Sequence, residues 1–242
     1  MNTLMLILAI SVAGPVLGSL IGVIKRPSPR FMADMLSFAA GVMLAISFLE
    51  LLPEAIKFST VGLSIFGLVA GALVLYCVDK IIPHIHPSLC SQEQGGNLEK
   101  TAVFLIMGIF IHNFPEGMAI ALGAVSGIGG GLAVGIGIAV HNIPEGICTS
   151  APYYYCTKKR MKSFLLSSAT AVPVILGFFF AKYMASALFQ SYIGILMAAT
   201  AGFMIYISAD ELIPSAFSLS NTHDVIFSLL AGVCLVLLLG LI

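Results

Sequence analysis

The sequence predicts an all-α integral membrane protein with eight transmembrane helices. Three observations lead to this prediction: the 242 residues are 59% hydrophobic, they are only 9% charged, and the apolar residues gather in eight separate runs. Soluble domains usually carry about 25% charged residues. A single soluble core of this length cannot bury so much apolar surface, whereas a lipid bilayer can.

The eight apolar runs have the length that a membrane requires. A helix needs about 20 apolar residues to cross ~30 Å of hydrocarbon, and only a helix satisfies its backbone hydrogen bonds within one segment. The runs cover residues 4–24, 33–53, 61–82, 101–124, 129–151, 163–184, 191–214 and 223–242. We therefore treat residues 1–242 as one transmembrane domain, with residues 84–100 as a loop between spans 3 and 4.

Basic residues predict the orientation of the chain. The connections after spans 1, 3 and 5 hold nine of the 11: Lys25, Arg26, Arg30, Lys80, Lys100, Lys158, Lys159, Arg160 and Lys162. The other side holds only Lys57 and Lys182. The positive-inside rule places the richer side, including residues 84–100, in the cytoplasm and both termini outside the cell membrane. Basic and acidic residues are equal in number, so charge gives no sign of a nucleic-acid partner.

Spans 2 and 7 share the pattern S-x-x-E-L-(L/I)-P-x-A. It covers Ser47–Ala55 in span 2 and Ser208–Ala216 in span 7. The two spans cross the membrane in opposite directions, so the pattern predicts that spans 1–3 recur, inverted, as spans 6–8. Inverted repeats are common in secondary transporters, whose substrate sites lie near the bilayer midplane at the interface of the repeats.

Spans 4 and 5 carry a second pair of related motifs, HNFPEG at His112–Gly117 and HNIPEG at His141–Gly146. Each motif places His and Glu four residues apart, on one face of a helix. Both histidines lie about 16–18 Å along their spans, near the middle of the bilayer. The proline in each motif leaves one helix carbonyl without its usual donor.

These motifs bring six polar residues to one depth: His112, Asn113, Glu116, His141, Asn142 and Glu145. A charged side chain at the centre of a transmembrane helix costs at least about 2.5–3.5 kcal/mol, and a bound cation offsets this cost. Imidazole nitrogen with carboxylate oxygen suits zinc, ferrous iron, cobalt or manganese better than calcium or magnesium. The structural alternative is a pair of proline-kinked helices joined by His–Glu hydrogen bonds; two copies at matched depth favour a metal centre.

The paired motifs, the repeated SFLELLPEA pattern and the eight spans resemble the ZIP (Zrt/Irt-like) family of metal transporters, in its bacterial broad-specificity branch. The resemblance implies eight helices in a 3+2+3 arrangement, no enzymatic activity, and uptake of zinc or another divalent metal (iron, cobalt, manganese or cadmium) into the cytoplasm. It also implies a metal centre, often binuclear, with His112, Glu116, His141 and Glu145 as principal ligands and Asn113 and Asn142 beside them.

One position departs from the family pattern. Many relatives carry a Glu directly before a Pro in span 6, where it helps to hold a second metal, whereas this chain has Val172 before Pro173. We therefore expect one tight central metal and a weak or empty second position near Asn113 and Asn142. On this interpretation Val172→Glu would strengthen the second position.

Further candidates lie outside the two central motifs. Glu50 and Glu211, with Asp210, are candidate acidic stations through which metal arrives and leaves; the alternative is that they only snorkel to the interface or pair at helix ends. In the connection between spans 3 and 4, His84, His86 and Cys90 could capture metal, although such short tracts are usually flexible. The sequence leaves the oligomeric state open, with a homodimer among the options.

An intramembrane zinc metalloprotease is the main competing function, because it also needs His and Glu within the membrane. Zinc proteases of the HExxH type place Glu next to the first His and a second His at i+4. No HExxH occurs in this chain, and Glu occupies the i+4 place. The motif pattern therefore favours a metal carrier.

Overall fold

The computed structural model describes residues 3–24, 27–81, 112–125, 127–187, 189–220 and 222–241, which form helices and no strand. The helices are α1 (Thr3–Ile24), α2 (Pro29–Ala45), η1 (Ile46–Leu51), α3 (Leu52–Phe58), α4 (Val61–Ile81), α7 (Ile128–Thr157), α8 (Arg160–Ser168), α9 (Ala171–Ala187), α10 (Gln190–Ile207), η2 (Ser208–Leu212), α11 (Ile213–Leu219) and α12 (His223–Leu239). Residues 112–123 are also helical.

Within these ranges, six helical stretches are long and apolar enough to cross a membrane: Thr3–Ile24, Pro29–Phe58, Val61–Val78, Ile128–Tyr154, Arg160–Ala187 and Gln190–Leu219. They correspond to six of the expected spans. The expected span 8 appears as α12, an apolar helix of 17 residues. The expected span 4 begins outside the described residues. The all-α membrane class is therefore confirmed, and the number of eight spans stays a prediction.

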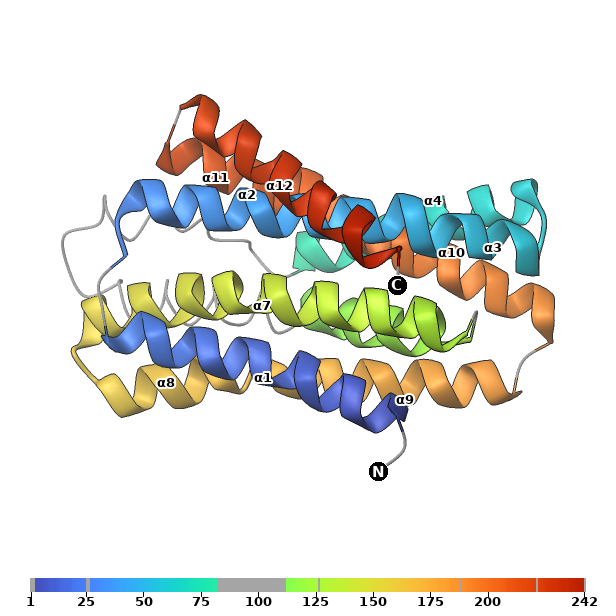
Figure 1. Ribbon diagram of the computed structural model, residues 1–242, viewed down its shortest axis with the longest axis horizontal. Coiled ribbons are helices and arrows are strands. Elements are labelled where there is room, and N and C mark those ends of the chain that lie inside the picture. Colours follow the sequence, from blue (N-terminus) through green and yellow to red (C-terminus); the bar gives the residue numbers. More distant parts are fainter. Residues whose placement is uncertain are drawn as a thin grey trace.

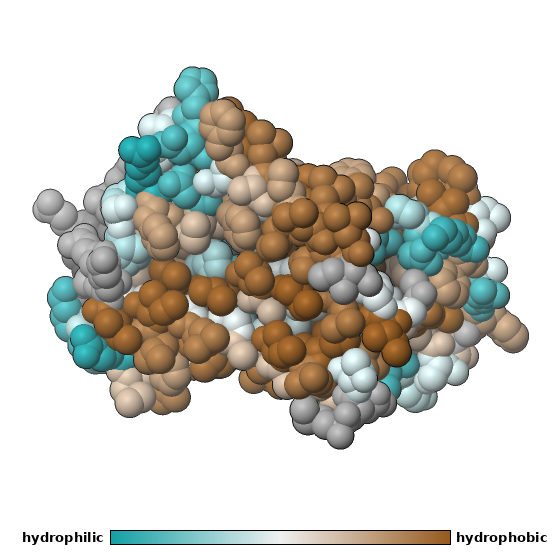
Figure 2. All heavy atoms as spheres, in the orientation of Figure 1, coloured by the Kyte–Doolittle hydropathy of each residue, from teal (hydrophilic) through white to brown (hydrophobic). Residues whose placement is uncertain are grey.

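The surface has the distribution that a bilayer demands. Hydrophobic residues cover the middle of the face shown in Figure 2, and hydrophilic residues gather toward the two ends of the long axis. Most exposed large apolar side chains lie on transmembrane helices, such as Phe66 at 64%, Leu17 at 50% and Phe227 at 68% exposed. These side chains need no protein partner, because lipid tails surround them.

Glycines let the long helices approach one another closely. A methyl group on Gly18 of α1 would collide with the carbonyl oxygen of Ile143 in α7. In the same way, a methyl group on Gly41 of α2 would collide with the backbone of α12, and one on Gly202 of α10 would collide with the backbone of α4. Figure 1 shows α1 beside α7, and α12 lying across α2. Small residues are the usual means of helix packing in membranes, since lipid gives no hydrophobic drive for association between helices.

The two copies of the S-x-x-E-L pattern adopt the same local structure. Each forms a π-helical turn, η1 or η2, and each turn is followed by a short α-helix with proline in its first two positions. The hydroxyls of Ser47 and Ser208 donate to the carbonyls of Met43 and Met204, both at 2.8 Å. Because a proline ring collides with the carbonyl four residues earlier, a widened turn before it relieves the clash.

The start of α1 and the end of α12 lie toward the same end of the long axis (Figure 1). At the opposite end, Arg30 at the start of α2 forms an ion pair with Asp224 at the start of α12. Both residues are exposed, so this pair contributes at most about 1 kcal/mol. It marks the end of the bundle where α2 and α12 begin.

The close approach of α12 to α2 predicts a difference between two glycine-to-alanine variants. A methyl group in Gly232→Ala would meet the backbone of Phe38 and Val42, whereas Gly62 in α4 has open space around it. We expect Gly232→Ala to destabilise the fold by about 1–3 kcal/mol. Gly62→Ala should be neutral or stabilising by up to about 1 kcal/mol. Melting temperatures of both variants in the same detergent measure this, and equal melting temperatures would contradict the packing.

Candidate metal centre

The two HNxPEG motifs lie on neighbouring helices. HNFPEG begins the described helical segment 112–123, and HNIPEG lies near the middle of α7. The connection between them ends at Gly127, whose φ of +134° is a conformation that favours glycine. A methyl group on Gly131 would press against Ala124, so the two helices pack closely at the turn. The short connection makes them antiparallel, as the sequence predicted.

The glycine that ends each motif fixes the direction of the glutamate before it. A methyl group on Gly117 would collide with the carbonyl oxygen of Val174 in α9, and one on Gly146 would meet the carbonyl oxygen of Pro15 in α1. Each motif therefore backs directly onto a neighbouring helix through its glycine. The glutamate, one residue earlier, turns about 100° away from that contact and lies in the interior.

Three side chains form the tightest group. His112, Glu116 and Glu145 each offer one ligand atom, and these atoms all lie within 4.8 Å of one another. Nε2 of His112 lies 3.7 Å from Oε1 of Glu116, as the i,i+4 spacing requires. The three residues are at most 3% exposed. Two ionised carboxylates at 4.8 Å repel by about 3.5 kcal/mol at an effective dielectric constant of 20, and a cation between them replaces that repulsion with attraction.

His141 contacts this group through Glu116. Its Nε2 lies 2.9 Å from Oε1 of Glu116, and its Nδ1 lies 3.1 Å from the carbonyl oxygen of Gly137. The ring is fully buried and is held at both nitrogens. This contact fixes the orientation of the Glu116 carboxylate, as residues around metal sites typically do for carboxylates that bind the metal.

Asn113 is also oriented by its surroundings. Its Nδ2 donates to the carbonyl oxygen of Thr170 at 2.8 Å, between α8 and α9. Its Oδ1 accepts no hydrogen bond and is buried. An amide oxygen fixed in this way is an acceptor available to a cation. Asn142, also fully buried, has no hydrogen-bond partner for either amide atom.

Unpartnered polar atoms concentrate in the two motifs. Among the described residues, nine buried side-chain nitrogen or oxygen atoms have no hydrogen-bond partner, and seven belong to these motifs: His112 Nδ1, Asn113 Oδ1, Glu116 Oε2, both amide atoms of Asn142 and both carboxylate oxygens of Glu145. Buried polar groups in native proteins are normally paired, and leaving one unpaired costs about 1–3 kcal/mol or more for a charged group. Apart from the amide nitrogen of Asn142, which is a hydrogen-bond donor, these atoms carry lone pairs that a divalent cation can accept.

Glu211 lies at the edge of the same centre. Its Oε2 is 3.7 Å from Nδ1 of His112, and its side chain is 16% exposed. The sequence left Glu211 outside the two central motifs, as a separate acidic station. The structure brings it to the centre, because the π-turn η2 within the helical stretch Gln190–Leu219 carries Glu211 beside His112.

The other acidic candidates do not meet the centre in any described contact. Glu50 is partly buried near Gly240 at the end of α12, and Asp210 is exposed. The loop candidates His84, His86 and Cys90 lie outside the described residues. Thr170 and the two motif glycines were missed by sequence reasoning. The recurrence of glycine after both glutamates was a signal that could have found Gly117 and Gly146.

Val172 does not face the centre. Its side chain is 46% exposed, whereas its neighbours Ala171 and Pro173 are buried. Val172 lies on the outer face of α9. This location does not support the expectation that a carboxylate at residue 172 would complete a second metal site. From this part of the chain, the carbonyl oxygen of Thr170 contacts Asn113 instead.

The fold and this site define a polytopic α-helical membrane protein with a buried group of His and Glu side chains that could hold a cation. The family model described as ZIP Zinc transporter matches residues 86–240. The zinc transporter ZupT of Enterobacter sp. (strain 638) is 36% identical over 230 residues, covering 91% of this chain and 89% of that protein.

Two further relatives agree. The zinc transporter ZupT of Salmonella heidelberg (strain SL476) is 35% identical over 230 residues, covering 91% of this chain and 89% of that protein. That of Chlorobium chlorochromatii (strain CaD3) is 35% identical over 238 residues, covering 89% and 88%. The chain belongs to the ZIP family. It is thus a membrane transporter of divalent metal and not an enzyme, as the sequence predicted.

The exposure of Val172 changes the prediction for this position. We expect Val172→Glu to leave the number and affinity of zinc ions bound to the purified protein unchanged, because the new carboxylate would lie on the outer face of α9. Val172→Gln is the matched control for size. Isothermal titration of zinc into each variant measures this, and an additional tight zinc ion in Val172→Glu alone would show that the helix turns this residue inward.

Proposed function

We propose that this protein carries zinc and related divalent ions, among them iron, cobalt, manganese and cadmium, through the centre formed by the two HNxPEG motifs. The movement is across the cell membrane into the cytoplasm. The observation that supports the proposal most strongly is the group of His112, Glu116 and Glu145, which are buried and lie within 4.8 Å of one another. Family membership agrees with a transported metal.

The chemistry of the group suits a borderline metal. One imidazole and two carboxylates are ligands that zinc accepts in tetrahedral sites with an open position. A transported ion must also leave, so a site with solvent or a weak ligand in its remaining positions serves better than a closed structural site. His141 then holds Glu116 in place and is available as a further nitrogen ligand once the metal draws Glu116 away from it.

The amides of Asn113 and Asn142 form the second part of the centre. Each amide has a buried Oδ1 without a hydrogen-bond partner. Because an amide is neutral, this oxygen can bind a cation without adding negative charge to the centre. We propose that they bind a second ion weakly or help an ion to pass. Glu116, Glu145 and the neighbouring Glu211 supply three negative charges, so two divalent ions would keep an excess positive charge of about one in a low-dielectric setting.

Glu211 gives the ion a neighbouring acceptor beyond His112. A carboxylate 3.7 Å from Nδ1 of His112 and partly exposed joins the buried centre to a more open environment. We propose that it hands ions to or from the centre, while Glu50 and Asp210 act nearer the surface and His84, His86 and Cys90 act in the cytoplasmic connection.

The arrangement of helices supports an inverted repeat as the framework for this movement. Glycine contacts pair α1 with α7 and α9 with segment 112–123, and also α2 with α12 and α10 with α4. Exchanging spans 1, 2, 3 and 4 with spans 6, 7, 8 and 5 maps each pair onto the other. We propose that the whole chain is one transporter domain of eight spans in a 3+2+3 arrangement, with a homodimer as its candidate assembly.

The alternative function, an intramembrane zinc metalloprotease, is not favoured. The relatives are named as zinc transporters, and neither HNxPEG motif places a Glu directly after its His. A metalloprotease uses a carboxylate that is not a ligand to activate water. Here both central glutamates belong to the group that would hold the ion.

The proposal is tested by zinc flux in sealed vesicles loaded with a fluorescent zinc indicator. We expect Glu116→Ala and Glu145→Ala each to lower the initial rate about a hundredfold or more, because breaking a buried charge interaction costs about 3–5 kcal/mol. Asp224→Ala, which removes an exposed carboxylate at the end of the bundle, should transport at the normal rate. Normal flux in a folded Glu116/Glu145 double variant would refute the assignment of the centre.

The orientation is tested separately. In a background without native cysteines, we expect Gly95→Cys to react with a membrane-impermeant maleimide only after the cells are opened, and Ile242→Cys to react in intact cells. The reason is the excess of basic residues on the side of the 3–4 connection. Reaction of both positions in intact cells would place that connection outside.

A further inference from the structure

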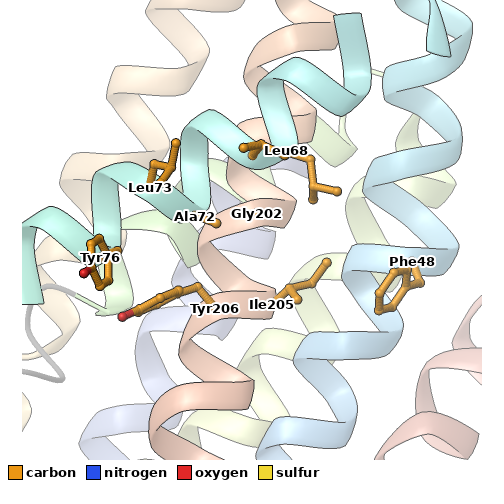
Figure 3. A pocket seen from close by; sticks show the side chains of 9 residues that line it. Phe48, Leu68, Ala72, Leu73, Tyr76, Gly202, Ile205 and Tyr206 are labelled. Atoms are coloured by element: carbon orange, nitrogen blue, oxygen red, sulfur yellow. The ribbon is translucent and has the colours of Figure 1, made fainter. Parts of the chain in front are cut away.

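An apolar groove runs along the membrane-facing side of α4. It has a volume of about 530 Å³, within the usual range of ligand pockets, about 300–1,000 Å³. Its walls come from three elements (Figure 3): Phe48 of η1, Ala72, Leu73 and Tyr76 of α4, and Ile205 and Tyr206 of α10. We refer to it as the α4 groove.

The α4 groove opens toward the bilayer. Of the six long apolar stretches, Val61–Val78 is the least covered by protein, with 22% of its residues buried. Leu73 is 55% and Phe48 is 53% exposed. A groove with such walls in a transmembrane region is filled by something apolar, because water gains no hydrogen bonds there.

One end of the groove is polar. The hydroxyls of Tyr76 and Tyr206 lie at the same end in Figure 3, away from Phe48. The ammonium of Lys80 lies one turn further along α4, 4.7 Å from the centre of the Tyr76 ring. Lys80 lies two residues beyond the apolar stretch, which ends at Val78, with Asp79 between them. The groove thus combines an apolar channel with a cation held at its polar end.

We propose that the α4 groove binds one anionic phospholipid of the leaflet on the Lys80 side, with an acyl chain in the channel and the phosphate at Lys80. Charge complementarity selects this occupant: an acyl chain alone explains the apolar walls but gives no use for the cation. The Tyr76 ring attracts the ammonium and keeps it at the mouth. A lysine near the membrane surface attracts anionic lipid by about 1 kcal/mol, or about a fivefold preference.

The position of the groove connects this lipid to the transport framework. Ile205 and Tyr206 come just before η2, which carries Glu211 beside His112, and Phe48 belongs to η1. A bound acyl chain therefore contacts the helices next to both π-turns. The binding itself does not depend on the identity of the transported ion.

The test is native mass spectrometry of the purified full-length protein, released from detergent containing equal amounts of dioleoyl phosphatidylglycerol and dioleoyl phosphatidylcholine. The wild-type protein should retain phosphatidylglycerol in preference to phosphatidylcholine. Lys80→Gln and Tyr76→Leu should each reduce this preference about fivefold. Lys159→Gln, which removes another exposed lysine, should keep the wild-type preference.

A second pair of variants tests the channel. Ala72→Phe fills the groove and should reduce retention of both lipids. Val74→Phe places the same side chain at a neighbouring exposed position outside the groove and should leave retention unchanged. If Ala72→Phe fails to fold, the lipid preferences of Lys80→Gln and Tyr76→Leu still test the proposal. An unchanged lipid preference in Lys80→Gln would overturn the proposal. Loss of a dimer mass in Ala72→Phe alone would also overturn it, because the groove would then be an interface between two copies of the chain.

Discussion

The constraint on which the rest of the structure depends is the burial of two carboxylates, Glu116 and Glu145, in the middle of a membrane protein. Both are at most 3% exposed, and both oxygens of Glu145 have no hydrogen-bond partner. A bilayer interior cannot hydrate them, and among the described residues the imidazoles of His141 and His112 lie 2.9 and 3.7 Å from Oε1 of Glu116. The remaining demand for positive charge is the physical basis of the proposal that a divalent cation binds there.

The surrounding helices hold this unfavourable arrangement in place through backbone contact. Gly117 and Gly146 press the two motifs against α9 and α1, so the glutamates cannot rotate outward without separating whole helices. Thr170 and Gly137 hold Asn113 and His141 through carbonyl oxygens. A stable framework made from glycine packing thus supports a centre that would not be stable on its own.

Much of the fold could be predicted from the sequence, because lipid reduces the choice to helices of known length. Six spans and the antiparallel pair around Gly127 follow from apolar runs and one glycine-rich turn. The central residues could be predicted because HNxPEG occurs twice and i,i+4 spacing fixes a helix face. The contact of Glu211 with His112 could not be predicted, since the motifs and span lengths do not reveal which residues of η2 meet segment 112–123 or that a π-turn precedes Pro214. The outward orientation of Val172 could not be predicted either. A resemblance to a family assigns a position in the sequence, but it does not give the rotation of the helix about its axis.

The central claim is that a divalent ion binds between the two motifs, and the most direct measurement is anomalous diffraction from crystals of the protein with zinc. The account predicts a zinc peak bounded by His112, Glu116 and Glu145, with nitrogen and oxygen ligands at about 2.0–2.2 Å. A zinc peak bound only at Glu50 or Asp210, or in the region of His84, His86 and Cys90, with none between the motifs, would contradict it.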